Sequence, residues 1–490
     1  MDLDATAPPA ADAAADSSPA KIDAAGAPPG VRAGRTFDRS IVEGPIWRAV
    51  WKIAWPTVLQ NAIGGLQGII DHAMVGHFVG FTANAAIGVS WQIFLVVIVF
   101  ISSLFTGMGV LVARAAGAND HHRVDQVVYQ AFLVAVLLAV GVLAPSGYFL
   151  APHLLRLVNA SPEVIAQALP FLRTMFLFSI GMLLFFMLGG ALRAAGDART
   201  PLRLGVVMTA LNIIFNVLLI SGAGPIPALG TRGAAIGTVL ASGCVSAVAM
   251  WMMLTGRLVI HFRREMSWKP DLTIIRQLFR FGLPAGIQGV AMNIAGVMLL
   301  RFIGSLEHSA EAQAAYAVGY AELFSLITWT SVGLMGAAAA VAGQNLGAGN
   351  PERSLRAVHL AARIGLGVAA CLAALFLSIP RVLLGIFSIT DPIVVELGTQ
   401  LLRYLSVSGF FITVALTFTG GLQGTGDTRS PLYITLVSQL VVPMGLCFAL
   451  QSMGRLEASG VWTAIVLGHA TRCVLTIWRF QQGKWKTIQV

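Results

Sequence analysis

The sequence predicts an all-α polytopic membrane protein with twelve transmembrane helices in two pseudo-symmetric six-helix lobes. Its 490 residues are 56% hydrophobic and only 11% charged, with a mean hydropathy of +0.78. A soluble protein carries about 25% charged residues and could not bury this much apolar surface. Twelve long apolar segments and an internal repeat are the other two observations. Together they exclude a soluble enzyme, a disordered scaffold and a protein with a nucleic-acid partner.

A spanning helix needs about 20 mainly apolar residues, and twelve segments satisfy this requirement. They lie at roughly 50–76, 86–112, 127–147, 164–190, 203–221, 233–255, 275–303, 315–342, 357–378, 393–420, 430–451 and 460–480. The first 45 residues are rich in Ala, Pro, Asp and Gly, which is typical of a disordered tail. The predicted organisation is therefore a cytoplasmic tail (1–45), an N-terminal lobe (46–255), a basic linker (256–274) and a C-terminal lobe (275–490).

The distribution of Lys and Arg predicts the orientation. With the N-terminus inside, 25 of the 32 basic residues fall on the cytoplasmic side and seven on the outer side. This is the positive-inside pattern, and it explains the net charge of +10 without an acidic partner. We expect a multi-pass protein of a bacterial-type inner (plasma) membrane with both termini cytoplasmic.

The two halves repeat each other. GALRAAGDARTPL (190–202) aligns with GGLQGTGDTRSPL (420–432) at an offset of 230, with seven of thirteen positions identical. An offset of 228 pairs Pro56 with Pro284. Because six helices separate the copies, both copies have the same orientation in the membrane. Two such lobes meeting over a central cavity are typical of a transporter.

A polar stripe in the first helix ends in a carboxylate. Gln60, Gly64, Gln67 and Asp71 follow spacings of 4, 3 and 4, which places them on one helix face. Ionisable groups inside the membrane are costly, and they mark coupling or substrate sites. Because burial disfavours its charged form, Asp71 can hold a proton, a sodium ion or a cationic substrate, one at a time. Such competition couples two fluxes without ATP, and metal beyond a possible sodium ion is not expected.

Polar residues in two later helices are candidate partners of Asp71. Asn212 and Asn216 are four residues apart in the fifth segment, and Thr238 lies in the sixth. Their oxygens suit a hard cation or a protonated carboxyl. Interhelical hydrogen bonds that only hold the lobe together are the alternative.

Further residues have two interpretations each. Trp91 and Tyr404 are candidates for an aromatic cavity wall that receives cations, or they are core aromatics. Gln60 and Gln67 are candidates for contact with a substrate. Glu322 fits the water interface, and His72 is either structural or a group that tunes Asp71.

The two GDxR[ST]P loops are candidate gating elements. Asp197, Arg199, Asp427 and Arg429 lie in these loops, which we expect on the cytoplasmic side. Thr200 and Ser430 are the expected helix N-caps, each followed by a proline. Pro56 removes one backbone hydrogen bond within the first helix, which predicts a hinge.

Together these motifs resemble the multidrug and toxic compound extrusion (MATE) family, from about residue 45 to 485. The resemblance rests on WPTVLQNAIGGLQGIIDHAMVGHFVG, ALRAAGDARTPL, LNIIFNVLLISG, GTRGAAIGTVLA and GQNLGAGNPERS in this order. It is closest to the DinF-like branch. It implies efflux of organic, often cationic, compounds by proton or sodium antiport with alternating access. Asp71 matches the coupling residue, Pro56 the bending proline, and Asn212 and Thr238 the polar partners.

One position departs from that branch. Asn216 stands where a second Asp can occur, and the loss of a charged ligand weakens a sodium site. The sequence therefore favours protons, with no cofactor. We expect a monomer in the lipid bilayer that exports an organic cation or another amphipathic small molecule.

Two other functions have weaker support from the sequence. A flippase for a lipid-linked sugar would need several basic residues inside the cavity, whereas the predicted spans place only Arg173 and Arg403 within the membrane, toward their outer ends. A membrane enzyme would need clustered acids, histidines or metal ligands at one face, and the Asp120–Asp125 loop is the nearest candidate.

Overall fold

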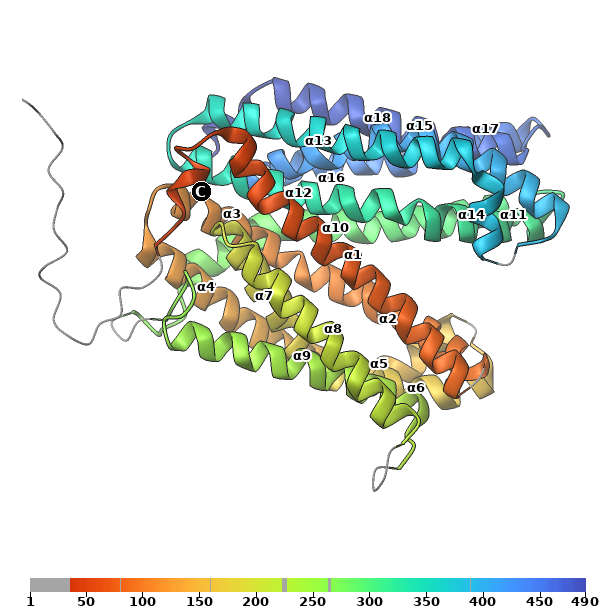
Figure 1. Ribbon diagram of the computed structural model, residues 1–490, viewed down its shortest axis with the longest axis horizontal. Coiled ribbons are helices and arrows are strands. Elements are labelled where there is room, and N and C mark those ends of the chain that lie inside the picture. Colours follow the sequence, from red (N-terminus) through yellow and green to blue (C-terminus); the bar gives the residue numbers. More distant parts are fainter. Residues whose placement is uncertain (1–35, 80, 159, 223–226, 263–265, 388) are drawn as a thin grey trace, which may run out of the picture. The chain divides into compact units, whose positions relative to one another are not determined.

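The computed structural model describes residues 36–490 except 80, 159, 223–226, 263–265 and 388. Of residues 69, 72, 73, 76–78, 81, 82 and 84 it describes only the backbone. Every long element in the described ranges is helical, as the apolar segments predict. The helices are labelled in Figure 1.

The N-terminal lobe contains six spans, three of them built from more than one helix. In order they are α1 (Ile46–Phe78), α2 (Phe81–Ser102) with α3 (Leu104–Gly117), α4 (His121–Val136) with the π-helix η2 (Leu137–Leu143) and α5 (Ala144–Leu157), α6 (Pro162–Leu177) with α7 (Ile180–Ala194), α8 (Arg199–Ile220), and α9 (Gly230–Leu254). The α6–α7 pair bends by 52°.

The C-terminal lobe repeats this plan. Its spans are α10 (Leu272–Ile303), α11 (Ser309–Tyr316) with the π-helix η3 (Ala317–Leu323) and α12 (Ser325–Gly347), α13 (Pro351–Ser378) with the short α14 (Pro380–Ile386), α15 (Pro392–Gly424), α16 (Arg429–Thr435) with the π-helix η4 (Leu436–Val441) and α17 (Val442–Ser452), and α18 (Ala458–Gln481). In the described part of the chain, ten helices are long and apolar enough to cross a membrane, and the bent α6–α7 pair makes eleven. The 33-residue α1, with its polar stripe, completes the twelve predicted spans.

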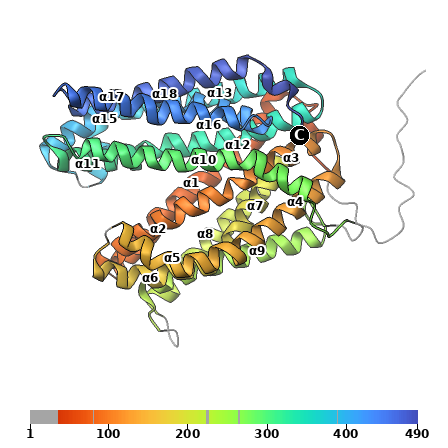
Figure 2. The same cartoon turned by 180° about the vertical axis from the view of Figure 1, so that it is seen from behind.

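The lobes approach each other through two matching pairs of helices. The first span of each lobe packs against the second span of the other, α1 against α12 and α10 against α3. Figures 1 and 2 show α2–α9 in one bundle and α10–α18 in the other. The bundles converge where α3, α7 and α12 end and separate toward α5–α6 and α11–α14. We call the convergent end the closed end.

Two equivalent glycines allow the backbones to touch at the closed end. A Cβ on Gly117 of α3 would lie 1.9 Å from the Gln344 carbonyl oxygen of α12. A Cβ on Gly347 would lie 2.1 Å from the Arg114 carbonyl oxygen. Gly117 and Gly347 correspond at the 230-residue offset, and so do Arg114 and Gln344. The two contacts are therefore equivalent and follow the pseudo-symmetry of the repeat.

The side chains at the same two positions reinforce this contact across the lobes. Gln344 donates to the Ala194 carbonyl at 2.6 Å, and Arg114 donates to the Thr425 carbonyl at 3.2 Å. Both carbonyls lie at the ends of the helices that precede the GDxR[ST]P loops. The closed end is therefore a hydrogen-bonded helix contact between the two lobes.

Part of the segment assigned to the tail is ordered. Residues 39–41 form a 3₁₀ turn, and Phe37 and Ile41 are buried. Asn345 donates to the Ile41 carbonyl at 3.3 Å, and Arg353 hydrogen-bonds the Ile41 and Gly44 carbonyls. These contacts attach residues 36–45 to the C-terminal lobe at the closed end, whereas residues 1–35 lie outside the described range.

The prediction that Thr200 and Ser430 cap their helices was wrong. The Asp197 carboxylate accepts from the Thr200 backbone N–H at 3.0 Å, and Asp427 accepts in the same way from Ser430 at 3.1 Å. A carboxylate three residues earlier satisfies the free N–H better than a residue already inside the first turn. Each loop turns tightly at its glycine, because Gly196 has a φ of +98° and Gly426 a φ of +100°.

Candidate functional site

The four predicted coupling residues form one hydrogen-bond chain in the N-terminal lobe. Asn216 Nδ2 donates to Asp71 Oδ1 at 2.9 Å and to Asn212 Oδ1 at 3.2 Å. Asn212 Nδ2 donates to Thr238 Oγ1 at 3.1 Å, and Thr238 donates to the Ala234 carbonyl. Three helices, α1, α8 and α9, thus meet at a half-buried carboxylate backed by two fully buried amides.

The chain leaves one buried acceptor unused beside the carboxylate. Asn216 Oδ1 is buried and has no hydrogen-bond partner among the side chains that the structure describes. Gly237 of α9 makes room for it, since a Cβ there would lie 2.2 Å from this oxygen. Buried polar groups are normally paired, so an unsatisfied oxygen next to Asp71 marks a place for a proton or a small cation.

Neighbouring helices also hold the rest of the polar stripe of α1. Gln60 Oε1 accepts from Arg193 Nη1 of α7 at 3.2 Å. Gln67 Oε1 accepts from Thr209 Oγ1 of α8 at 2.9 Å. The stripe therefore faces the interior of its own lobe along its length. Gln60 and Asp71 are eleven residues apart, which corresponds to about 16 Å along the helix.

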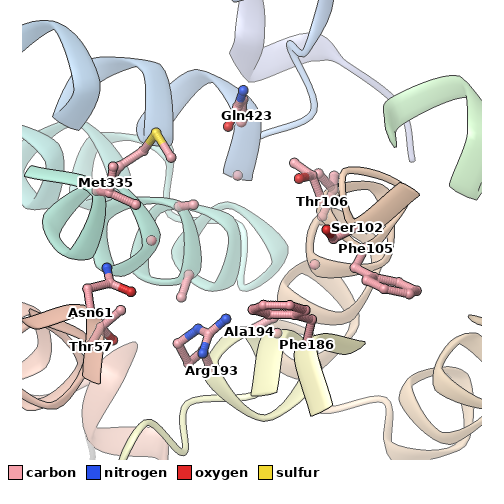
Figure 3. A pocket seen from close by; sticks show the side chains of 18 residues that line it. Thr57, Asn61, Ser102, Phe105, Thr106, Phe186, Arg193, Ala194, Met335 and Gln423 are labelled. Carbon is pink, nitrogen blue, oxygen red and sulfur yellow. The ribbon is translucent and has the colours of Figure 1, made fainter. Parts of the chain in front are cut away.

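A cavity of about 280 Å³ lies between the lobes, next to the closed end. Figure 3 shows side chains from both lobes around it. The polar residues of its wall are Thr57, Asn61, Ser102, Thr106, Arg193 and Gln423. Phe105, Phe186 and Met335 contribute apolar surface. Arg193 is the one charged residue in the described lining, so the deepest part of the interlobe space is electropositive.

The predicted aromatic candidates lie elsewhere. Trp91 packs against the core of the N-terminal lobe, 5.9 Å from the Phe94 ring centroid. Tyr404 packs against the core of the C-terminal lobe. Neither lines the cavity in the described structure. Glu322 is exposed on η3, and the side chain of His72 lies outside the described residues.

The predicted hinge residue lies within α1, and the predicted gating residues lie at the closed end. Helix α1 continues through the buried Pro56 as one element. Arg199 and Arg429 are exposed at the start of α8 and α16, at the closed end. Asp427 is buried and pairs with Arg479 Nη2 at 2.8 Å. The hinge and gating roles stay predictions.

The sequence did not single out two cavity residues that occupy equivalent positions. Arg193 and Gln423 correspond at the offset of 230, and both line the cavity. Their partners correspond too, because Arg193 bonds Gln60 and Gln423 Nε2 donates to Gln288 Oε1 at 3.1 Å, and Gln288 follows Gln60 by 228. The repeat alignment was the signal that could have found this set.

The assignment of span arginines to Arg173 and Arg403 alone was wrong. Helix α7 continues to Ala194, so Arg193 lies inside it and reaches the cavity. Arg472 lies in the middle of α18 and is 2% exposed. Arg193 was assigned to the loop because the predicted span stops at 190, whereas Arg472 was assigned to the C-terminal end although it lies inside the predicted span 460–480.

Two repeated helical lobes, a carboxylate site inside one of them and a polar cavity between them define a multi-pass membrane transporter. The chain belongs to the MatE family, whose pattern matches residues 56–218 and 284–449. These two matches fall on the two predicted repeats.

Similar proteins agree with this assignment. The chain is 27% identical to "Probable multidrug resistance protein NorM" of Thermotoga maritima over 436 residues, 89% of this chain and 92% of that protein. It is 25% identical to "Multidrug resistance protein MdtK" of Pectobacterium atrosepticum, covering 89% of this chain and 95% of the relative. A solved structure described as an "outward-facing conformation of a multidrug resistance MATE family transporter" superposes with a TM-score of 0.84 at 21% identity, over 92% of this chain and 98% of that one. This last likeness supports the fold alone.

Proposed function

We propose that this protein exports small organic compounds by cation antiport, with Asp71, Asn212, Asn216 and Thr238 as the coupling site. The observation that carries the proposal is the hydrogen-bond chain that ends at Asp71 beside the unused Asn216 oxygen. Multidrug resistance proteins among its relatives support the substrate class. An intramembrane carboxylate with amide partners is suited to exchanging an ion against a substrate.

The geometry favours a proton over sodium. Sodium is a hard cation that prefers several oxygen ligands. In this site Asn212 Oδ1 already accepts from Asn216, and Thr238 Oγ1 already accepts from Asn212. The oxygens that accept no hydrogen bond are the second Asp71 oxygen and Asn216 Oδ1, while Asn212 Oδ1 and Thr238 Oγ1 each keep at most one lone pair for a cation. A protonated Asp71 needs only one acceptor for its O–H, and Asn216 Oδ1 is the nearest candidate.

The substrate is an amphipathic small molecule, and its cationic part belongs near Asp71. The cavity at the closed end carries the Arg193 charge, which repels an organic cation bound beside it. Asp71 lies about 16 Å farther along α1. A compound with a positive group and an apolar body would therefore bind with the positive group toward Asp71 and the body toward Phe186 and Met335.

Transport requires the closed end to open. We propose that the closed end faces the cytoplasm, in a bacterial-type inner membrane with both termini cytoplasmic, and that the protein acts as a monomer. Alternating access then breaks the contacts of Gly117 with Gln344 and of Gly347 with Arg114, together with their reinforcing bonds, and α1 bends at Pro56. The GDxR[ST]P loops adjoin this contact, which suits a gating role.

The test is efflux of a fluorescent organic cation from proteoliposomes under separately imposed proton and sodium gradients. We expect a proton gradient alone to drive export by the natural protein. Asp71→Asn keeps the size and a hydrogen-bond acceptor but removes the titrating charge, so proton-driven export should be lost and the organic cation should bind more weakly. Binding of a neutral analogue, measured by fluorescence anisotropy, should be retained, and this separates lost coupling from lost folding.

A conservative change away from the site provides the control. Trp91→Phe keeps an aromatic ring in the core of the N-terminal lobe and changes no charge. This variant should therefore retain proton-driven export. Export driven by sodium alone would overturn proton coupling. If neither gradient moves the cation, the flippase alternative is tested next with a lipid-linked anion, because Arg193 supplies the basic cavity residue that this cargo needs.

A further inference from the structure

A permanent charge is buried without compensation in the C-terminal lobe. Arg472 of α18 is 2% exposed. Its Nη1 lies 3.9 Å from Met292 Sδ, a weak acceptor, and its Nε has no hydrogen-bond partner. The ion pairs found among the described residues involve other groups: Arg39–Glu43, Lys52–Asp38, Arg479–Asp427 and Lys486–Glu352.

Among the described residues, a second unpaired donor lies on η4, which packs against α18. Gln439 of η4 is 8% exposed, and its Nε2 has no partner. This atom lies 3.6 Å from the position of a Cβ on Gly468, one helical turn before Arg472. The nearby Ser438 Oγ is also buried and unpaired. The unsatisfied groups here are mainly donors, and donors around a cation need an anionic acceptor.

The surrounding side chains do not supply that acceptor. His469 Nδ1 is paired with the Ser408 hydroxyl at 2.5 Å, and His469 and Tyr320 are the titratable groups near Arg472. Neither is an acid at neutral pH. Arginine does not lose its proton in proteins, and an uncompensated buried charge destabilises a fold by several kcal/mol. A counter-ion from outside the chain is the remaining way to neutralise this site.

A polar path joins the site to the interlobe cavity. Gln423 lines the cavity and donates to Gln288, and Gln288 donates to Thr435 at 3.0 Å. One turn beyond Gln288 on α10, Met292 contacts Arg472. The guanidinium therefore lies one layer of side chains behind the cavity wall.

We propose that the C-terminal lobe binds a small monovalent anion at Arg472, with Gln439 as a second donor. The ligand is chloride or the carboxylate of a transported compound, and it enters from the cavity past Gln423 and Gln288. Arg472 binds it by charge, and the paired N–H groups of its guanidinium suit a carboxylate equally well. The site is separate from Asp71 and does not depend on antiport.

Thermal unfolding of the purified full-length protein tests the site. The protein is kept in detergent with sodium gluconate, because the gluconate anion is too large to enter a buried site. Gluconate is then replaced stepwise by chloride or acetate at constant ionic strength. The midpoint should rise by about 1–3 °C for each tenfold increase in the bound anion above its dissociation constant. A rise with chloride alone identifies a halide site, and a rise with acetate identifies a carboxylate site.

Three variants make the test specific. Arg472→Gln should abolish the anion response and, in gluconate, unfold no earlier than the natural protein, because the uncompensated charge is gone. Arg472→Lys keeps the charge and should respond at a several-fold higher anion concentration, as should Gln439→Leu. Arg455→Gln makes the same charge change at an exposed position of this lobe and should retain the full response.

The proposal fails if neither anion raises the midpoint of the natural protein. It also fails if Arg472→Gln keeps the anion response. A third contrary result is that Arg472→Gln is less stable than the natural protein in every anion while Arg472→Lys responds to anions as the natural protein does. Those results would make Arg472 a packing residue.

Discussion

The two lobes share one frame but place opposite charges inside it. Near the closed end they match, because Gln60 accepts from Arg193 in one lobe as Gln288 accepts from Gln423 in the other. Farther along the first helix of each lobe, the equivalent residues differ. Asp71 of α1 corresponds to Leu299 of α10 at the 228-residue offset, and Leu299 is buried in an apolar core.

The unsatisfied atoms next to these two interior charges also differ. Beside the acid of the N-terminal lobe, the unpaired atom is the acceptor Asn216 Oδ1. In the C-terminal lobe the interior charge is Arg472, and the unpaired atoms near it are the donors of Arg472 and Gln439. The repeat thus supplies a symmetric contact between the lobes, and each lobe has its own interior chemistry. The N-terminal lobe is suited to a cation and the C-terminal lobe to an anion.

The largest expected effect comes from closing the space beside Asn216. In Gly237→Ala the new Cβ would lie 2.2 Å from Asn216 Oδ1, so the amide must move away from Asp71. Losing a buried hydrogen bond costs about 1–3 kcal/mol, and proton-driven export should fall about tenfold or more. Gly243→Ala lies on the same helix with no atom within 4 Å and should be neutral. Equal export by both variants in the proteoliposome assay would remove Asn216 from the coupling site.

The next effect concerns Arg193, which carries a charge where the equivalent cavity residue of the other lobe, Gln423, is neutral. Arg193→Gln restores the residue type of the equivalent Gln423 and removes the positive charge from the cavity wall. A unit charge at roughly 10 Å is worth about 2 kcal/mol at an effective dielectric constant near 20. Binding of an organic cation should therefore tighten by about tenfold, and binding of an anionic analogue should weaken. Titration by fluorescence anisotropy measures both. An identical shift for a neutral analogue would indicate a change of shape rather than of charge.

Sequence patterns could predict that Asn212, Asn216 and Thr238 meet because their contacts are between neighbouring helices, whereas Asp71 joins them from 145 residues away. Asn212 and Asn216 are separated by one helical turn, and α8 and α9 are neighbours in the chain, so their side chains had to meet near Thr238. Trp91 and Tyr404 were less predictable, since an aromatic side chain suits a core as well as a cavity wall. Arg193 and Arg472 were missed for another reason. Hydropathy ended the predicted span before Arg193, whereas the helix continues to Ala194. The predicted span 460–480 already contained Arg472, and only the side-chain packing shows that its charge is buried.

The closed end offers a symmetric test of the frame. Gly117→Ala and Gly347→Ala each place a Cβ about 2 Å from a carbonyl oxygen of the opposing helix. Such overpacking costs about 1–3 kcal/mol, so both variants should populate the open state of this end to a similar degree. The measurement is labelling of Thr106→Cys in the cavity by an impermeant thiol reagent added to inside-out vesicles. Gly367→Ala, with no atom within 4 Å, is the control. Strongly unequal labelling of the two variants would show that one lobe controls the contact.

The smallest effect should distinguish the two GDxR[ST]P loops. Asp427 is buried and pairs with Arg479 at 2.8 Å, whereas Asp197 in the equivalent loop is half-buried and accepts from Thr200. Arg479 is itself 22% exposed, so water moderates the loss of this pair. Arg479→Gln should lower the free energy of unfolding by about 1–2 kcal/mol, read from the denaturation midpoint in mixed micelles. Arg203→Gln removes an exposed arginine close to the other loop and should change the midpoint by less than about 0.5 kcal/mol. If both variants lower the free energy of unfolding equally, the Asp427–Arg479 pair does not make the two loops differ in stability. The difference between the lobes would then lie in their interiors alone.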